Sequence, residues 1–180
     1  MNVSGTLLEV RKSPVHGLGV FATRDIPAGT LLGEYAGELI SAAEAAARAE
    51  ARSRRDPRAP IYIFELDAGH FIDASAETGS AEKNFARFIN HSCDENCEAL
   101  ARERRIEIRT IRDVRAGEEL SLDYGFALAG FFERPCRCGA KNCVHFIVAK
   151  PLRPALLRKL AARSRARSRT RSRTRSRTRS

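Results

Sequence analysis

A cluster of cysteines carries the clearest chemical signal in this chain. Cys136, Cys138 and Cys143 lie within eight residues of one another. Zinc closes a tetrahedral structural site with four ligands, and this CxCx4C pattern supplies only three, so the metal must recruit a further donor from elsewhere. We therefore predict a structural Zn2+ site in which Cys93 is the fourth ligand, with Cys97 and His145 as rival candidates.

The alternative is that these cysteines are ordinary buried thiols, as we expect for Cys97 if it binds no metal. A disulfide framework is disfavoured, because residues 1–15 include Glu9, Arg11 and Lys12 and lack the apolar region of a secretory signal. The sequence therefore predicts an intracellular, reducing compartment.

Two further segments have the composition of a ligand site. The run from Asn90 to Cys93 places an amide, an imidazole, a hydroxyl and a thiol directly after the apolar Phe88-Ile89. Such polar groups at the edge of a core need specific hydrogen-bond partners, in the protein or in a ligand. Gly17 and Gly19 offer backbone that a ligand can approach closely. Either segment alone is also compatible with a plain loop.

Length and charge limit the possible classes of protein. A chain of 180 residues with 43% hydrophobic content can build one domain. No apolar run approaches the roughly 20 residues of a membrane span, so we expect a soluble protein. The net charge of +10 resides at the end of the chain, because every second residue from Arg163 to Arg179 is Arg. Residues 1–162 hold 23 basic and 22 acidic side chains.

The Arg/Ser/Thr tail has almost nothing to bury and is predicted to be disordered. It could bind nucleic acid, an anionic membrane or an acidic partner, or serve as a targeting signal. It could equally be an extension that only keeps the protein soluble.

The elements expected around these residues are short strands with one inserted helix. Ser41 and Glu44 form a capping-box pattern ahead of an alanine-rich run to about Arg54. A short second helix is predicted over 154–162. The motif RDxxAG occurs at 24–29 and again at 112–117, and is interpreted as the turn of two separate hairpins. Apolar or alternating patterns predict strands at 7–10, 18–22, 30–40, 61–66, 106–111 and 119–124.

Taken in order, these motifs resemble the SET domain with its post-SET zinc module, most closely the trithorax-type histone lysine methyltransferases. The resemblance covers about residues 5–150. It implies a SET domain at 1–127 with a helical insert at about 41–56, a post-SET module at 128–150, and a C-terminal helix and tail at 151–180. The motifs that carry it are GLGVF at 17–21, YAGE at 35–38, YIF at 62–64, RFINHSC at 87–93, EELSLDY at 118–124 and the CxCx4C cluster.

The implied fold is mostly β, with small sheets around a threaded pseudoknot in which the NHSC and DY segments cross. The implied function is methylation of protein lysine side chains with S-adenosyl-L-methionine as the methyl donor. By position in the family motifs, the residues that bind this cofactor would be Gly17, Leu18, Gly19, Tyr35, Arg87, Asn90, His91 and Phe146. Phe146 would pack on the adenine of the cofactor, and Phe131 or Phe132 could take its place.

The resemblance also assigns the catalytic residues. Tyr124 would orient the lysine amine, and Tyr62 would form a second wall of the lysine channel. Phe64 and Leu122 would line the same channel. Related enzymes usually carry Tyr or Phe where this chain has Leu122, so the number of methyl groups transferred stays open.

The implied substrate is a histone-like, basic tail. The enzyme is expected to act as a monomer. Glu65, Asp67 and Asp73 are candidates for an acidic groove that would attract it. The implied location is nuclear or chromosomal in a eukaryote or in an invaded host cell, and cytoplasmic otherwise. The alternative is a non-catalytic, zinc-stabilised module that binds nucleic acid or chromatin through the Arg-rich tail.

Overall fold

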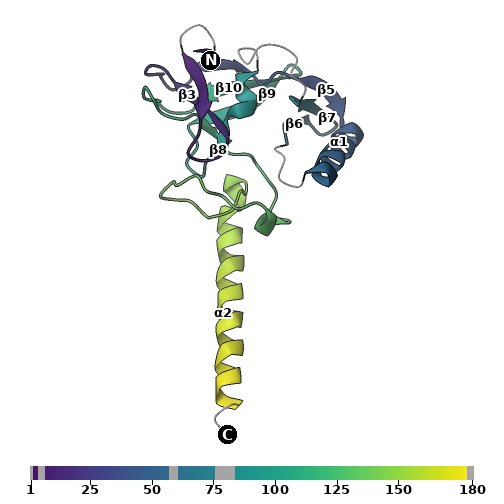
Figure 1. The fold of residues 1–180 in the computed structure, drawn as a ribbon, viewed down its shortest axis with the longest axis vertical. Helices are drawn as coiled ribbons and strands as arrows, with labels where there is room; N and C mark the ends of the chain where they lie inside the picture. Colours follow the sequence, from purple (N-terminus) through teal and green to yellow (C-terminus); the bar gives the residue numbers. More distant parts are fainter. Residues whose placement is uncertain (1, 4–6, 57–60, 76–83, 178–180) are drawn as a thin grey trace. The chain divides into compact units, whose positions relative to one another are not determined.

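The computed structural model describes residues 2–3, 7–56, 61–75 and 84–177, and the side chains among them except those of 2–3 and 166–177 (Figure 1). The chain divides into two compact units. Unit 1 comprises residues 1–90 and 95–122, and unit 2 comprises residues 91–94 and 123–180. The chain therefore passes from one unit to the other after Asn90, after Asp94 and after Leu122.

Small sheets form most of unit 1, as the mostly β prediction requires. Three antiparallel sheets have the strand orders β1-β2-β3, β4-β10-β9 and β5-β7-β6, and β11 pairs with β8. The strands are β1 (Asn2–Val3), β2 (Leu8–Lys12), β3 (Leu18–Ala22), β4 (Leu31–Glu34), β5 (Glu38–Ser41), β6 (Ile63–Asp67), β7 (His70–Asp73), β8 (Asn90–His91), β9 (Cys97–Arg102), β10 (Arg105–Thr110) and β11 (Ser121–Leu122).

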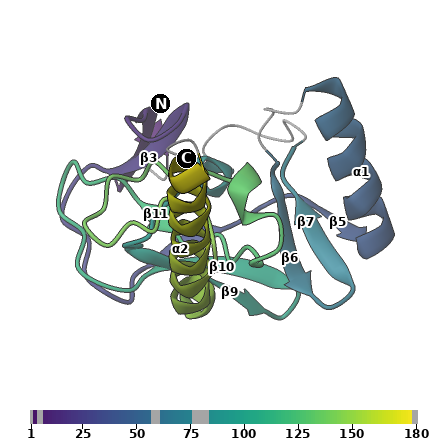
Figure 2. The ribbon, with the colours of Figure 1, turned by 90° about the horizontal axis from the view of Figure 1, so that it is seen from below.

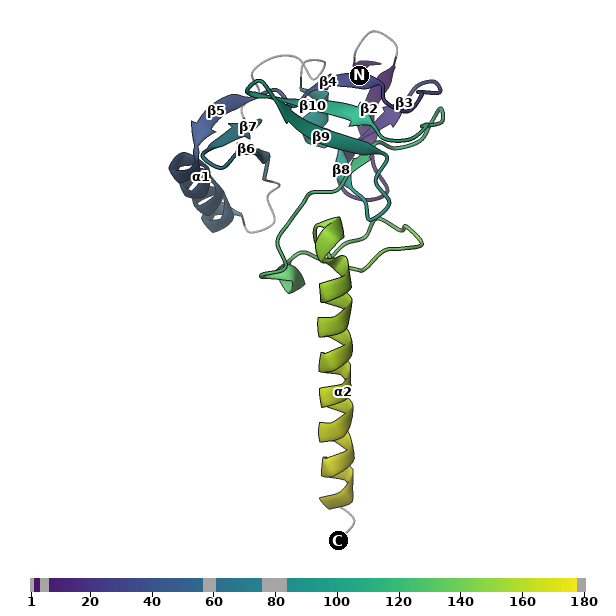
Figure 3. The same ribbon diagram turned by 180° about the vertical axis from the view of Figure 1, so that it is seen from behind.

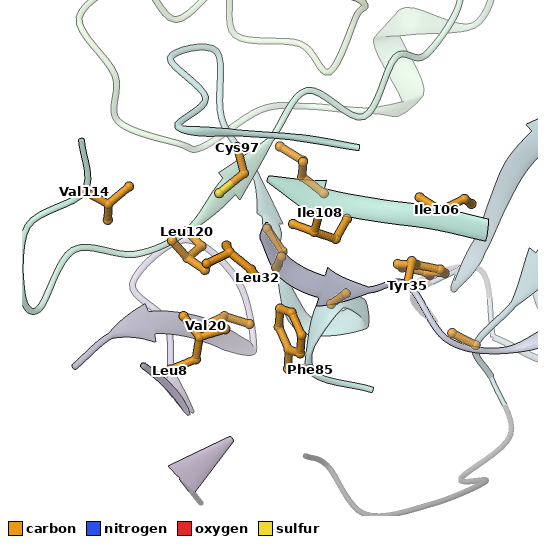
Figure 4. Close-up of a cluster of buried hydrophobic side chains, with 14 of the residues drawn as sticks. Leu8, Val20, Leu32, Tyr35, Phe85, Cys97, Ile106, Ile108, Val114 and Leu120 are labelled. Carbon is orange, nitrogen blue, oxygen red and sulfur yellow. The ribbon is translucent and has the colours of Figure 1, made fainter. Parts of the chain in front are cut away.

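One hydrophobic core holds these sheets together. Val20 of β3, Leu32 of β4 and Ile108 of β10 point into a shared cluster with Leu120 (Figure 4). Cys97 is fully buried in the same cluster. Burial of this apolar surface supplies the main driving force for folding of unit 1.

The predicted helix is present as α1 (Ala42–Arg55), and its capping box is confirmed. The Ser41 hydroxyl accepts the backbone N–H of Glu44 (3.3 Å), and the Glu44 carboxylate accepts the backbone N–H of Ser41 (2.9 Å). The helix lies beside the β5-β7-β6 sheet (Figure 2). Arg48 joins them, because its guanidinium contacts Glu38 of β5 at 2.7 Å and Asp73 of β7 at 2.9 Å.

Several strand predictions need correction. The strand expected over 30–40 is divided into β4 and β5, which belong to different sheets. Gly37 marks the division: a Cβ there would lie 2.5 Å from the carbonyl oxygen of Asp73. The pattern also missed β7 and β9, and Figure 3 shows β9 beside β10. Of the strand expected over 119–124, only β11 forms.

The prediction of two separate RDxxAG hairpins is wrong, because the two motifs pair with each other. Their third residues form an isolated antiparallel bridge. The Asp113 carboxylate accepts the N–H of Ala28 (2.9 Å), and the Asp25 carboxylate accepts the N–H of Ala116 (2.8 Å). The Asp of each motif therefore accepts a hydrogen bond from the turn of the other motif. This mutual pairing accounts for the repeated sequence, and no hairpin is needed.

Unit 2 is built from turns and one long helix around a small core. Its elements are the short 3-10 helices η2 (Phe131–Glu133) and η3 (Lys150–Leu152) and the helix α2 (Arg153–Arg177). Leu156 and Val148 are fully buried with Cys93 in this core. No helix within the described part of the chain is long and apolar enough to span a membrane.

The helix α2 corrects the expectation for the C-terminus. A helix was predicted over 154–162 and disorder from Arg163 onward, whereas the helix continues to Arg177. Arg ranks high in helix propensity, and this stretch contains neither Gly nor an internal Pro after Pro154. Residues 178–180 lie outside the described part of the chain.

Candidate active site

Asn90 organises the glycine turn in unit 1. Its side chain is only 9% exposed. The amide nitrogen Nδ2 lies 3.2 Å from the carbonyl oxygen of His16, 3.0 Å from that of Leu18 and 2.8 Å from Oε1 of Glu119. Since all three neighbours are acceptors, Nδ2 is committed to the protein, and Oδ1 is the atom left to accept a hydrogen bond from a ligand.

Glu119 and Ser13 hold Asn90 and the turn in place, a role that the sequence did not predict for either residue. The Ser13 hydroxyl lies 2.8 and 2.9 Å from the two carboxylate oxygens of Glu119. It also accepts the backbone N–H of Val15 at 2.9 Å. A Cβ at Gly19 would lie 2.3 Å from Glu119 Oε1, so the carboxylate needs a glycine beside it. The only available signal was the acidic pair at 118–119, and nothing local says which of the two faces the turn.

Gly17 and Leu18 show why the turn suits a ligand. Gly17 has a φ of 51°, in the left-handed region that favours glycine. Open space surrounds the position of its absent Cβ, so backbone conformation is what selects glycine here. Leu18 is 46% exposed. The turn therefore exposes part of its surface, and hydrogen bonds from the Asn90 side chain hold its backbone.

Three aromatic residues predicted for the lysine channel or the cofactor pocket, Tyr35, Tyr62 and Phe64, pack in or against the core of unit 1. The Tyr35 and Phe64 rings lie 5.3 Å apart. The Arg87 guanidinium lies 4.4 Å from the centre of the Tyr62 ring, a cation–π contact. Leu122 is 3% exposed within the hydrophobic core. These contacts fix the rings in place, and the roles assigned to them stay predictions.

Asp73 does not suit the predicted acidic groove. Its side chain is 5% exposed and is paired with Arg48 of α1. Burial works against its charge, but hydrogen bonds from Ser75 and Arg48 outweigh it and lower the pKa of Asp73. A buried carboxylate paired with an arginine is not available to contact a substrate. Glu65 and Asp67 are both exposed, and Asp67 accepts hydrogen bonds from the turn that follows it.

In unit 2, His91 fixes the backbone of Tyr124. Nδ1 of His91 accepts the backbone N–H of Tyr124 at 3.3 Å, and the two rings lie 5.4 Å apart. His91 is buried, whereas Tyr124 is 37% exposed. An acceptor Nδ1 places the proton of a neutral imidazole on Nε2, which lies 3.8 Å from Sγ of Cys93. The tyrosine hydroxyl is thus carried by an anchored backbone.

The four predicted cysteines converge in unit 2. The sulfur atoms of Cys93, Cys136, Cys138 and Cys143 all lie within 4.8 Å of one another. Cys93 Sγ is 3.9 Å from the sulfurs of both Cys136 and Cys143. Four soft donors at this spacing match a structural zinc site, and the cluster is compatible with that metal. The gathering of Cys93 with the CxCx4C cysteines is confirmed.

The electrostatics of the cluster oppose ionisation of most of its thiols. Burial raises the pKa of Cys93 to about 11 and also raises the pKa of Cys136. Burial opposes ionisation of Cys138 too, but hydrogen bonds from the backbone N–H groups of Cys93 and Ala140 and from neighbouring thiols lower its pKa to about 7. Without metal, the negative charge therefore concentrates on Cys138. Full ionisation of four adjacent thiols requires a bound positive ion.

The rival ligands lie elsewhere. Cys97 is in the core of unit 1, where burial raises its pKa to about 12. His145 is exposed and contributes its backbone N–H to Cys143 Sγ at 3.4 Å. Among the aromatic candidates for the adenine, Phe131 is 2% exposed and packs edge-on to Phe146 at 4.9 Å. Phe131 is therefore part of the core.

The glycine turn, the NHSC segment and the four converging cysteines are the features of the family expected from the motifs, and comparison identifies that family. The profile of the SET domain matches residues 17–125. This chain belongs to the SET-domain family. The match confirms the family predicted from the motifs.

The relatives carry histone methyltransferase names. The "Histone-lysine N-methyltransferase, H3 lysine-4 specific" of Saccharomyces cerevisiae is 39% identical over 142 residues, which is 76% of this chain and 13% of that protein. "Histone-lysine N-methyltransferase trithorax" of Drosophila virilis is 36% identical over 142 residues, 77% of this chain and 4% of the relative. The "Histone-lysine N-methyltransferase, H3 lysine-36 specific" of Homo sapiens is 32% identical over 148 residues, 80% of this chain and 5% of the relative. The chain thus spans a small part of each of these relatives.

The cysteine cluster gives a first prediction. The protein should bind a single zinc ion per chain, and Cys136→Ser should abolish most of this binding and lower the melting temperature. The reason is that the core of unit 2 packs directly against the four cysteines. Native mass spectrometry measures the zinc content. Cys97→Ala is the matched control and should keep the zinc. Unchanged zinc content in Cys136→Ser would contradict the ligand set.

Glu119 gives a second prediction. Glu119→Ala should lower the free energy of unfolding by about 1–3 kcal/mol, because it removes the charged acceptor that the buried Asn90 amide and the Ser13 hydroxyl share. Urea unfolding measures this change. Glu98 is exposed on β9, and Glu98→Ala should shift the free energy by less than about 0.5 kcal/mol. Equal stability of the two variants would show that Glu119 does not support the turn.

Proposed function

We propose that this chain is a protein-lysine N-methyltransferase that uses S-adenosyl-L-methionine. The observation that carries the proposal is the partly exposed Tyr124, whose backbone is anchored by His91 inside the segment that matches the SET domain. A tyrosine with an anchored backbone and a partly exposed side chain suits the orientation of an incoming amine.

The methyl donor is proposed to bind through residues of the family motifs. In unit 1 these are Gly17, Leu18, Gly19, Tyr35, Arg87 and Asn90, and in unit 2 they are His91 and Phe146. The turn fits a ligand with a free ammonium group, because Asn90 Nδ2 is committed to protein acceptors and Oδ1 remains to accept from such a group. The donor supplies a methyl group on a positively charged sulfur.

The acceptor is proposed to be a lysine side chain. Free lysine has a pKa of about 10.4, and its ammonium form has no lone pair for attack. Loss of water and proximity to a positive sulfonium both favour the neutral amine. In the transfer, the C–N bond forms as the C–S bond breaks, and the sulfur keeps the bonding electron pair. The amine proton has left for solvent beforehand, and Tyr124 orients the nitrogen.

The channel residues are proposed to be Tyr62, Phe64 and Leu122 together with Tyr124. Leu122 cannot hydrogen-bond the amine or a water, so it does not restrict the acceptor by polar contact. We propose that the methyl count is set by the space next to Phe64, whose ring already packs against Tyr35.

The substrate is proposed to be a histone tail or a similar basic tail. The relatives' names specify different residues of histone H3, lysine-4 and lysine-36, so likeness alone does not choose between them. A chromosomal location and action as a monomer follow as parts of the same proposal. Nothing in the described residues favours the alternative of a binding module without catalysis. The cysteine cluster is proposed to hold Zn2+ in a structural role.

Methyl transfer is the direct test. Wild-type protein incubated with labelled methyl donor should methylate histone H3 or another protein in a basic panel, and mass spectrometry reports the site and the number of methyl groups. Tyr124→Phe should lower kcat roughly 100-fold or more, because the hydroxyl that orients the amine is lost. Binding of the donor, measured by calorimetry, should be retained in this variant. Full activity of Tyr124→Phe would remove Tyr124 from the mechanism.

The Arg-rich tail is proposed to bind nucleic acid beside the histone substrate. Nine arginines alternate from Arg163 to Arg179 with no acidic residue among them. Such a segment gains affinity by releasing counterions from phosphates, independent of base sequence. It would hold the enzyme on the DNA that accompanies its substrate and so raise the local substrate concentration.

Salt dependence tests the tail. Affinity for duplex DNA should fall steeply with salt, with a log–log slope of up to about −8 if all the tail arginines contact phosphate. Replacing the nine arginines by Gln should remove most of this slope and leave methylation of a free peptide unchanged. Fluorescence anisotropy at several salt concentrations measures the slope. An unchanged slope after replacement would assign DNA binding to another part of the chain.

A further inference from the structure

A buried arginine begins the helix α2. Arg153 is 7% exposed, and its side chain lies in unit 2 at the start of this helix. Arg158, in contrast, is exposed on the same helix. A buried guanidinium carries five donors that need acceptors, so its surroundings reveal what it holds together.

The first partner of Arg153 is the backbone at a zinc-ligand candidate. Nη1 donates to the carbonyl oxygen of Cys93 at 2.6 Å, and Nε donates to the carbonyl oxygen of Val148 at 3.2 Å. The Asn142 side chain also donates to the Cys93 carbonyl, at 3.2 Å. Two side chains therefore hold the backbone carbonyl of Cys93.

The second partner is Asp123, the residue before Tyr124. Nη2 of Arg153 lies 3.3 Å from Oδ2 of Asp123. The same oxygen accepts the backbone N–H of Lys150 at 2.6 Å, and Oδ1 accepts the N–H of Gly125 at 3.2 Å. Asp123 thus anchors the backbone on both sides of Tyr124 to the segment that starts α2.

These contacts form a closed ring of residues. From Arg153 the ring runs through Asp123 to Tyr124, whose N–H donates to His91, and His91 Nε2 lies 3.8 Å from Cys93 Sγ. The Cys93 carbonyl accepts a hydrogen bond from Arg153 Nη1, and this contact closes the ring. Two of these links are hydrogen bonds, at 2.6 and 3.3 Å, one is an ion pair at 3.3 Å and one is a sulfur contact at 3.8 Å. A shift at the cysteine cluster is therefore passed to the Tyr124 backbone through several contacts of unequal strength.

We propose that Arg153 is a positioning residue that couples the cysteine cluster to Tyr124. It touches neither substrate nor donor, and acts by holding Asp123 and Cys93 in a fixed relation. The inference rests on the proposed function for its catalytic consequence. It also gives the first turn of α2 a role in activity, in addition to the packing of Leu156 in the core of unit 2.

The position of the Tyr124 backbone can be measured without any enzyme assay. The chain has three tyrosines, so zinc-loaded protein labelled with 15N-tyrosine should give three amide signals. In Arg153→Ala the Tyr124 signal should move by more than its linewidth, while the signals of Tyr35 and Tyr62 stay in place. Arg153→Lys should move it less. The matched control Arg158→Ala should move none of the three.

Kinetics separate positioning from plain stabilisation. For Arg153→Ala with full zinc content, kcat should fall roughly 10- to 100-fold, the loss expected when a catalytic group is misplaced. The KM for a histone peptide should stay within about twofold, because binding surface is not removed. Millimolar guanidinium ion should restore part of kcat by refilling the buried site, and should do nothing for Arg158→Ala.

The outcomes are distinct. A zinc-loaded Arg153→Ala with an unmoved Tyr124 signal and unchanged kcat would overturn the inference. So would a loss of kcat that follows loss of zinc and is reversed by added zinc alone. If Arg153→Ala does not fold, the same criteria apply to Arg153→Lys. If wild-type protein methylates nothing in the panel, the proposed function fails, and the tyrosine signals still decide whether Arg153 positions Tyr124.

Discussion

Two peptide bonds determine how the polar residues of the chain are divided between its two compact units. The bond from Asn90 to His91 and the bond from Leu122 to Asp123 each carry the chain from unit 1 into unit 2. On the first crossing, Asn90 holds the glycine turn with its side chain, and the next residue holds Tyr124. The polar run that begins at Asn90 is therefore divided between the two compact units, and its groups have hydrogen-bond partners within each.

The small size of unit 2 is a second constraint, because it limits how much apolar surface the unit can bury around the cysteine cluster. Its described core is a handful of apolar residues around the cysteines, too few to expect independent stability from burial alone. Without metal, raised pKa values keep Cys93 and Cys136 protonated, and Cys138 takes the charge. A metal bound by the four sulfurs would stabilise their ionised forms and so link the segments that carry them.

Local patterns in the sequence predicted those features whose cause is local. The capping box at Ser41 needed only spacing and chemistry. The three cysteines of CxCx4C were likewise found by spacing, whereas the choice of Cys93 over its rivals Cys97 and His145 joins residues 43 apart and was settled by the fold. The strand β9 was missed because CEALAR has weak strand propensity, and because its hairpin turn uses Glu103 and Arg104 at positive φ in place of Asn-Gly. Glu119 was missed because its partners lie more than 25 residues away. The family resemblance supplied the roles of individual residues, which composition and periodicity could not have done.

The RDxxAG repeat shows how a correct observation produced a wrong structure. Two equal motifs were interpreted as two equal hairpins, since Asp and Gly suit a tight turn. A turn carboxylate, however, accepts whichever N–H groups lie within reach, and here each Asp meets the backbone of the other motif. Pairing two like turns satisfies both with one geometry and ties residues 24–29 to residues 112–117. The segment fixed in this way leads directly into Glu119 and β11, so a contact with no chemical role sets where the carboxylate that holds Asn90 must lie.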